Sequence, residues 1–178
     1  MVVGLRIALG MVALAVTCGP AVTPAGATQA GGDEARRGAL AAGVVAELNS
    51  LRAKRGLVAL RVSPALAAAA AHHSREMLQN GYFDHRSADG SAFSKRVARF
   101  YPAGRGSWSV GENLLWASPE IDASSALRMW MGSPDHRRNM LDPSWREVGI
   151  SALHVTAAPG FYKGLEVTIV TANFGLRG

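Results

Sequence analysis

The spacing of apolar residues changes once along this chain, from a helical period in its first part to strict alternation near its end. Residues 65–79 are rich in alanine and stop at Asn80-Gly81, which is typical of a helix and its C-terminal stop. The segments 148–153 and 167–172 alternate as strands do. Helices first and strands last, without a regular βαβ order, predict an α+β fold with helices packed on an antiparallel sheet.

Short sequence signals refine this prediction. Serine caps helix N-termini and proline is tolerated in the first turn, so a Ser-Pro pair predicts a helix start. Such pairs occur at Ser63-Pro64, Ser118-Pro119 and Ser133-Pro134. A further helix is expected from about residue 40 to 55, a third strand over 110–116, and a hairpin connection over 157–164.

The first 30 residues have the order of an export signal. Arg6 precedes an apolar run over residues 7–16, and small residues follow, so we expect cleavage near residue 27 or 30. The run is too short to cross a bilayer of about 30 Å as a helix, which disfavours a permanent anchor. We therefore expect a signal peptide at 1–30, a polar lead at 31–38, and one domain at 39–178 with no integral membrane span.

The single cysteine, Cys18, falls within this export signal. A lipoprotein anchor there fits poorly. A small residue is usual immediately before the cysteine, where this chain has Thr17, and a large aliphatic residue is usual three positions before it, where this chain has Ala15. The mature chain would then contain no cysteine, and neither disulfides nor thiolate metal sites can support it. The expected location is outside the cytoplasmic membrane: secreted, periplasmic or in the cell envelope.

The chain is basic, with a formal net charge of +6, and its basic residues are scattered rather than clustered. Scattered charge gives no argument for a nucleic-acid partner, whereas a net positive charge attracts anionic envelope polymers and lipid headgroups. Zinc-protease helices of the His-Glu-x-x-His type, phosphate-binding loops and dinucleotide fingerprints do not occur in the sequence.

Three residues stand out as candidates for chemistry. His85 lies in a loop just after a helix end, Glu112 interrupts an apolar strand, and His136 follows the Ser133-Pro134 pair. Two imidazoles and one carboxylate can hold a divalent metal such as zinc, can act as an acid/base pair, or can form a structural hydrogen-bond network. Spacing alone favours the structural network over the other two. Ser133 is explained by helix capping, because no Gly-x-Ser-x-Gly turn surrounds it.

Several segments, in order, resemble the CAP superfamily (SCP-like domains), which includes cysteine-rich secretory, antigen 5 and plant pathogenesis-related proteins. They are Glu47-Leu48-Asn49-Ser50-Leu51-Arg52, Pro64-Ala65-Leu66 with Ala71-His72-His73-Ser74-Arg75-Glu76-Met77, Gly81-Tyr82-Phe83-Asp84-His85, Val110-Gly111-Glu112-Asn113-Leu114, residues 129–141, and Trp145-Arg146-Glu147-Val148-Gly149-Ile150. Eukaryotic members use disulfides, so the chain is similar to the bacterial, cysteine-free type.

The resemblance implies a three-layer α-β-α sandwich with a central antiparallel sheet. It also implies a cavity with two histidines and two acidic residues, which binds a metal in some members. His85, Glu112 and His136 fall on three of these four positions, and Ser133 falls on the fourth. Glu147 is a candidate to replace the missing carboxylate.

The same resemblance implies a secreted module that binds a lipid or an envelope-derived ligand at a cavity lined by His85, Glu112, His136, Ser133 and Glu147. A metal-dependent hydrolase or protease, with His85 and His136 as metal ligands beside Glu112, is the alternative. Enzymatic activity is left open.

Overall fold

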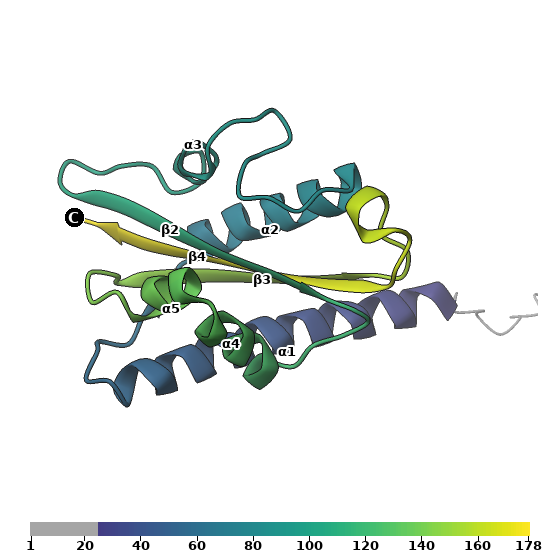
Figure 1. Ribbon diagram of the computed structural model, residues 1–178, viewed down its shortest axis with the longest axis horizontal. Coiled ribbons are helices and arrows are strands. Elements are labelled where there is room, and N and C mark those ends of the chain that lie inside the picture. Colours follow the sequence, from purple (N-terminus) through teal and green to yellow (C-terminus); the bar gives the residue numbers. More distant parts are fainter. Residues whose placement is uncertain (1–24) are drawn as a thin grey trace, which may run out of the picture.

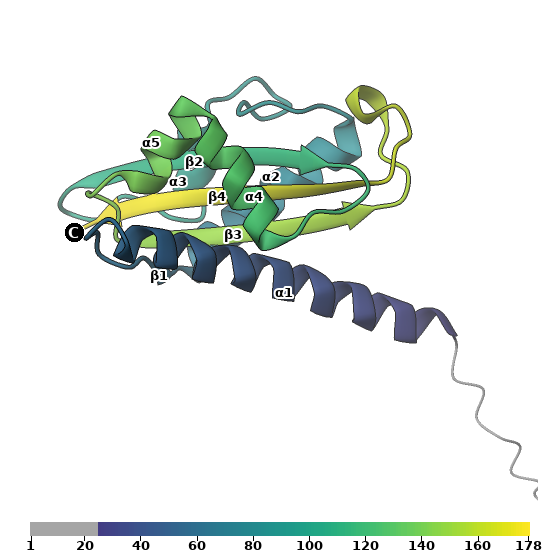
Figure 2. The same cartoon turned by 60° about the horizontal axis from the view of Figure 1, so that its bottom comes forward.

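The computed structural model describes residues 25–178, and their side chains from residue 32 onward. Most of the expected export signal therefore lies outside the described residues. The chain forms three layers (Figures 1 and 2). One face of a sheet is covered by α1 (Ala25–Ala53), α4 (Ala123–Gly132) and α5 (Pro134–Leu141), and the other by α2 (Pro64–Asn80) and the short α3 (Phe93–Ala98). The predicted α+β class and α-β-α sandwich are confirmed.

The sheet has four strands in the order β1-β3-β4-β2. They are β1 (Arg61–Val62), β2 (Trp108–Ala117), β3 (Glu147–Val155) and β4 (Val167–Arg177), and a short 3-10 turn, η1 (Gly160–Tyr162), lies in the connection from β3 to β4. Strand β4 pairs antiparallel with β2 and with β3, as the alternation predicted. The sheet is mixed rather than purely antiparallel, because the two-residue β1, which was not predicted, runs parallel to β3.

Helix α2 has both of the predicted ends. The Ser63 hydroxyl accepts a hydrogen bond from the Leu66 N–H at 3.4 Å, and Gly81 ends the helix in the left-handed conformation at φ 66°. The helix packs so closely on β3 that a Cβ atom at Gly149 would collide with the backbone of Ala67. This close approach fixes the position of the polar residues at the far end of α2.

Two local predictions differ from the structure. Helix α1 begins at Ala25 rather than near residue 40, so residues 31–38 are helical. The side chains of residues 32–38 are largely exposed, and an i,i+3 ion pair of Glu34 and Arg37 helps this stretch stay helical without a core. Ser118-Pro119, whose peptide bond is cis, starts no helix. Helix α4 begins later and is capped by the Asp122 carboxylate, which accepts from the Ser125 N–H.

The third Ser-Pro pair does begin a helix, with Pro134 in the first turn of α5. Ser133 lies between α4 and α5, but its side chain makes no capping hydrogen bond. Ser133 is thus the N-cap residue of α5 by position, as predicted, but it does not cap the helix through its hydroxyl.

The largest apolar cluster lies between the sheet and the layer of α1, α4 and α5. It includes Trp130, Trp145 and Phe174. Because Trp130 also donates from its indole N–H to the Leu114 carbonyl of β2 at 3.1 Å, α4 is fixed to the sheet. This places the start of α5 next to the middle of β2.

Candidate functional site

Glu112 lies in the middle of β2, and its side chain is only 1% exposed. One carboxylate oxygen, Oε2, accepts a hydrogen bond from the Arg96 guanidinium of α3 at 2.6 Å, forming a buried ion pair. Asn173, the residue opposite Glu112 on β4, donates to the same oxygen at 3.1 Å in the amide orientation that satisfies both of its ends. The negative charge of Glu112 is therefore compensated inside the protein, as burial of a charge requires.

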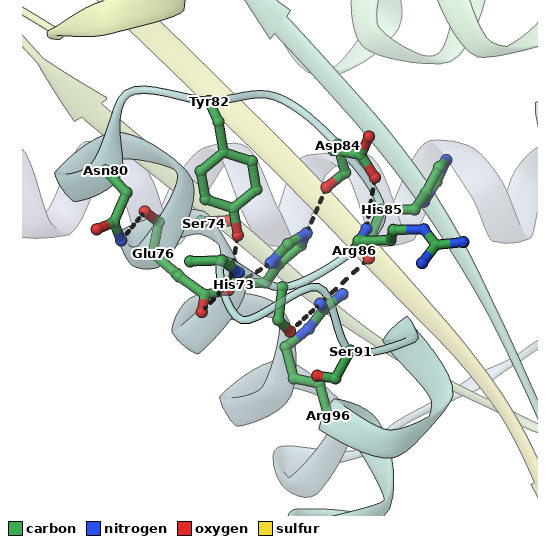
Figure 3. Close-up of polar contacts among 12 residues, drawn as sticks. His73, Ser74, Glu76, Asn80, Tyr82, Asp84, His85, Arg86, Ser91 and Arg96 are labelled. Carbon is green, nitrogen blue, oxygen red and sulfur yellow. Dashed lines mark hydrogen bonds and ion pairs between the residues drawn. The ribbon is translucent and has the colours of Figure 1, made fainter.

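His85 contacts the other oxygen of this carboxylate. Its Nδ1 lies 2.9 Å from Glu112 Oε1, and its side chain is half exposed. Because an ionised carboxylate only accepts, the ring proton is on Nδ1, and Nε2 is left free for a ligand or a proton. Arg96 also holds the loop that carries His85, since it donates to the His85 carbonyl at 3.2 Å and to the Ser87 hydroxyl at 2.9 Å (Figure 3).

A second polar network supports the same loop from α2 (Figure 3). His73 is fully buried, and its Nε2 donates to the Asp84 carbonyl at 2.9 Å, while its Nδ1 lies 3.3 Å from Glu76. Tyr82 donates to the same Glu76 carboxylate at 2.7 Å. Burial lowers the pKa of His73 despite the neighbouring carboxylate of Glu112. These contacts fix the backbone next to His85.

His136 lies in the first turn of α5, beside this cluster. Asn113 donates to the His136 carbonyl and Asn139 to the Glu112 carbonyl, each at 3.0 Å, so α5 is tied to β2 on both sides of the carboxylate. Burial lowers the pKa of His136, and the positive charge of His85 lowers it further, while Asp135 raises it. The His85 ring is therefore close enough to affect the protonation of His136.

The two remaining residues from the sequence analysis lie in different places. Ser133 is half-buried, one helical turn before His136. Glu147 begins β3 and accepts a hydrogen bond from Tyr101 at 2.5 Å, with Arg61 and Arg177 beside it. The structure thus brings His85, Glu112 and His136 together, with Ser133 next to them, and gives Glu147 a separate set of partners.

The donor set around His85 does not fit a zinc site. Both Glu112 oxygens are already engaged, one by His85 and one by Arg96, so the carboxylate orients an imidazole and does not serve as a ligand. Protein zinc sites use three or four side-chain ligands. Among residues 25–178, no three histidine, cysteine, aspartate or glutamate side chains gather as metal ligands do.

Sequence reasoning missed Arg96, His73 and Glu76, although they hold the loop and the carboxylate. The spacing of His73 and Glu76, three residues apart on a helix, is a signal that both share one face. Arg96 offers no such signal, because one arginine in a short helix looks like any surface arginine until the tertiary contacts are known.

Comparison with known proteins decides the family. The profile of the Cysteine-rich secretory protein family, CAP, matches residues 45–174, which is most of the chain and includes the whole cluster. The chain belongs to the CAP family. Its single cysteine, Cys18, lies outside the matched residues, in agreement with a cysteine-free type of CAP domain.

Several solved structures share the fold. The chain superposes with a TM-score of 0.64 on an extracellular protein containing an SCP domain from Bacillus anthracis, at 25% identity, covering 90% of this chain and 45% of that one. The TM-score is 0.59 for an outer surface protein from Borrelia burgdorferi, at 19% identity, covering 76% of this chain and 90% of that one. The TM-score is 0.57 for a cysteine-rich secretory protein from Staphylococcus aureus, at 16% identity, covering 78% of this chain and 38% of that one.

Two curated Bacillus subtilis proteins also match part of this chain. The uncharacterized protein YkwD is 32% identical over 108 residues, and the uncharacterized membrane protein YlbC is 28% identical over 102 residues. The matches cover 60% and 57% of this chain but only 40% and 28% of those proteins. Within residues 25–178, no helix is long and apolar enough to cross a membrane.

Proposed function

We propose that this protein is an exported CAP-domain binding module that takes an anionic ligand of the cell envelope at His85 and His136. The observation that carries the proposal is the half-exposed His85 ring, oriented by a carboxylate whose charge is already compensated by Arg96. The site therefore presents imidazoles to solvent rather than a free carboxylate. Once the outward nitrogen of His85 takes up a proton, such a surface suits phosphate or carboxylate groups, which accept hydrogen bonds from charged donors.

The surrounding charge supports an anionic ligand. Arg86 follows His85, and Arg137 and Arg138 follow His136; all three side chains are exposed. Arg138 pairs with Asp135 at 3.0 Å, and the Asp84 carboxylate lies beside Arg86, so Arg137 contributes most of the uncompensated charge. A net charge of +6 adds long-range attraction toward anionic surfaces.

Export is the second part of the proposal. The order of residues 1–30 and the extracellular or surface location stated for the Bacillus anthracis and Borrelia burgdorferi proteins support it. Mass spectrometry of the protein from culture medium should find an N-terminus just after residue 27 or 30. An intact N-terminus in the cell pellet would contradict export and cleavage.

Calorimetric titration can test the binding site and separate two sources of the same phosphate chemistry. The probes are soluble polyglycerol phosphate and phosphatidylglycerol vesicles, with phosphatidylcholine vesicles as the neutral comparison. We expect the wild type to bind at least one of the two anionic probes. The affinity should fall about tenfold or more in the His85→Ala, His136→Ala double variant. The His154→Ala variant is the matched control, because this histidine pairs with Glu166 elsewhere and binding should be unchanged. Equal binding by the double variant, or no anion binding, would overturn the proposal.

One observation favours hydrolysis as a second candidate function. The 2.9 Å contact of His85 with Glu112 leaves Nε2 free, as in a general base whose tautomer is fixed by a carboxylate. Ester or peptide hydrolysis that disappears in His85→Ala would support this activity. A metal-dependent form has less support, because Glu112 is engaged by Arg96.

A further inference from the structure

A groove of about 560 Å³ lies along the outer edge of β3, between α1 and α2. Small residues keep it open: Ala67, Ala68 and Ala71 on α2, and Gly38 and Ala41 on α1. Residues 150–155 of β3 form its floor. This groove does not include His85, Glu112 or His136, so it is separate from the site described above.

The floor of this groove is an unpaired strand edge. Strand β1 pairs only with Glu147 and Val148, and the Val148 carbonyl accepts from the Ser63 N–H at 2.8 Å on that side. Backbone groups alternate in direction along a strand, so those of Ile150, Ala152 and His154 point the same way, into the groove. No strand pairs with them in the part of the chain that the structure describes.

This backbone chemistry decides what can fill the groove. Ile150 and Ala152 are only 8% and 5% exposed, and an acyl chain would remove the remaining water from the backbone N–H and C=O groups that face the groove without replacing their hydrogen bonds. An extended peptide would satisfy them, as in strand addition to a sheet edge. We propose that the groove binds an extended segment of a partner protein, which pairs with β3 as a fifth strand on the same edge of the sheet as β1.

Length and charge define the segment further. The free edge from Gly149 to Val155 is about 20 Å long, which accommodates about six extended residues. Arg75 lines the α2 wall, is exposed, and forms no ion pair among residues 32–178, whereas Arg37 on the α1 wall is paired with Glu34 at 3.0 Å. The segment therefore carries small or apolar side chains and an acidic residue facing Arg75.

Selection from a phage-displayed heptapeptide library tests this proposal while the partner is unidentified. The full chain is the target, and the Ala68→Trp variant, which fills the groove from an exposed position, is used to remove peptides that bind elsewhere. Ala46→Trp is the matched control, because Ala46 is exposed on α1 outside the groove. We expect enriched peptides with an acidic residue that bind the wild type and the control and bind Ala68→Trp at least tenfold more weakly.

Two further measurements separate strand addition from other contacts. A bound peptide should slow hydrogen exchange at the amides of Ile150, Ala152 and His154, and its backbone N-methylated form should not bind. Arg75→Glu should weaken binding of the acidic peptides, and the His85→Ala, His136→Ala double variant should not, so this proposal and the proposed function fail separately.

Several results would overturn the proposal. They are no enrichment, enriched peptides that bind Ala68→Trp equally well, and retained binding after N-methylation. Self-association of the chain that Ala68→Trp abolishes would assign the groove to a second copy. Displacement of the peptides by phosphatidylglycerol vesicles, with no exchange protection at the edge, would assign it to lipid.

Discussion

Glu112 is the residue on which the geometry of the site depends. Its carboxylate joins a loop through His85, a helix through Arg96 and a neighbouring strand through Asn173. The arrangement leaves one imidazole nitrogen directed outward while the charge that orients it remains buried.

Loss of the Glu112 charge is expected to be costly. Glu112→Gln keeps the shape of the side chain but leaves the Arg96 guanidinium buried without its counter-ion, which should reduce the free energy of unfolding by about 3–5 kcal/mol. Urea unfolding measures this. Asp135→Asn is the control, because its ion pair with Arg138 is exposed, and a loss of less than about 1 kcal/mol is expected there. A similarly small loss for Glu112→Gln would contradict the description of a buried, mutually dependent pair.

The protonation of His136 predicts a pH dependence. Burial, followed by the charge of His85, lowers its pKa below the usual 6.5, so the unfolded chain binds this proton more readily than the folded chain. Stability should be full above pH 6.5 and fall as the pH decreases through 6.5 toward the folded-state pKa. A bound anion raises the pKa of His136, so the affinity for the anion should rise as the pH decreases over the same interval.

Urea unfolding between about pH 7.5 and 5 checks the sign of this effect. His136→Gln should lose less stability than the wild type as the pH falls, because this residue no longer takes up a proton on unfolding. Parallel curves for the two proteins would show that His136 makes no such contribution.

At the scale of elements, the contact between α2 and β3 determines where the loop and the groove lie. Gly149→Ala should reduce the free energy of unfolding by about 1–3 kcal/mol or more, because the added methyl group meets the α2 backbone at Ala67, which cannot move aside alone. Gly132→Ala is the matched control, since its Cβ would meet no atom within 4 Å. Equal effects of the two substitutions in thermal unfolding would contradict this close packing.

The open edge of β3 predicts alternating amide exchange along one strand. In the free protein, the N–H groups of Ser151 and Leu153 bond to β4, whereas those of Ile150 and Ala152 face the groove. Native-state hydrogen exchange should therefore be about tenfold or more faster at Ile150 and Ala152 than at their neighbours. Uniform protection along β3 would show that the edge is already paired.

At the scale of the whole molecule, the sequence predicted the order of most helices and strands but not the contacts between residues far apart in the chain. Local spacing predicted α2, β2, β3 and β4, and the order of the family motifs singled out His85, Glu112 and His136. Strand β1 was missed because two residues carry no period. Arg96 was missed because its importance comes from burial against β2. The early start of α1 was missed because residues 32–39 contribute no core residues to make an apolar pattern.

Anion binding by His85 and His136 on an exported CAP domain is tested most directly by the histidine ring signals in an NMR titration with glycerol phosphate. We predict saturable shifts at His85 and His136, with His72 and His154 unchanged. Shifts that are absent, or equally large at His154, would contradict an anion site at these two histidines.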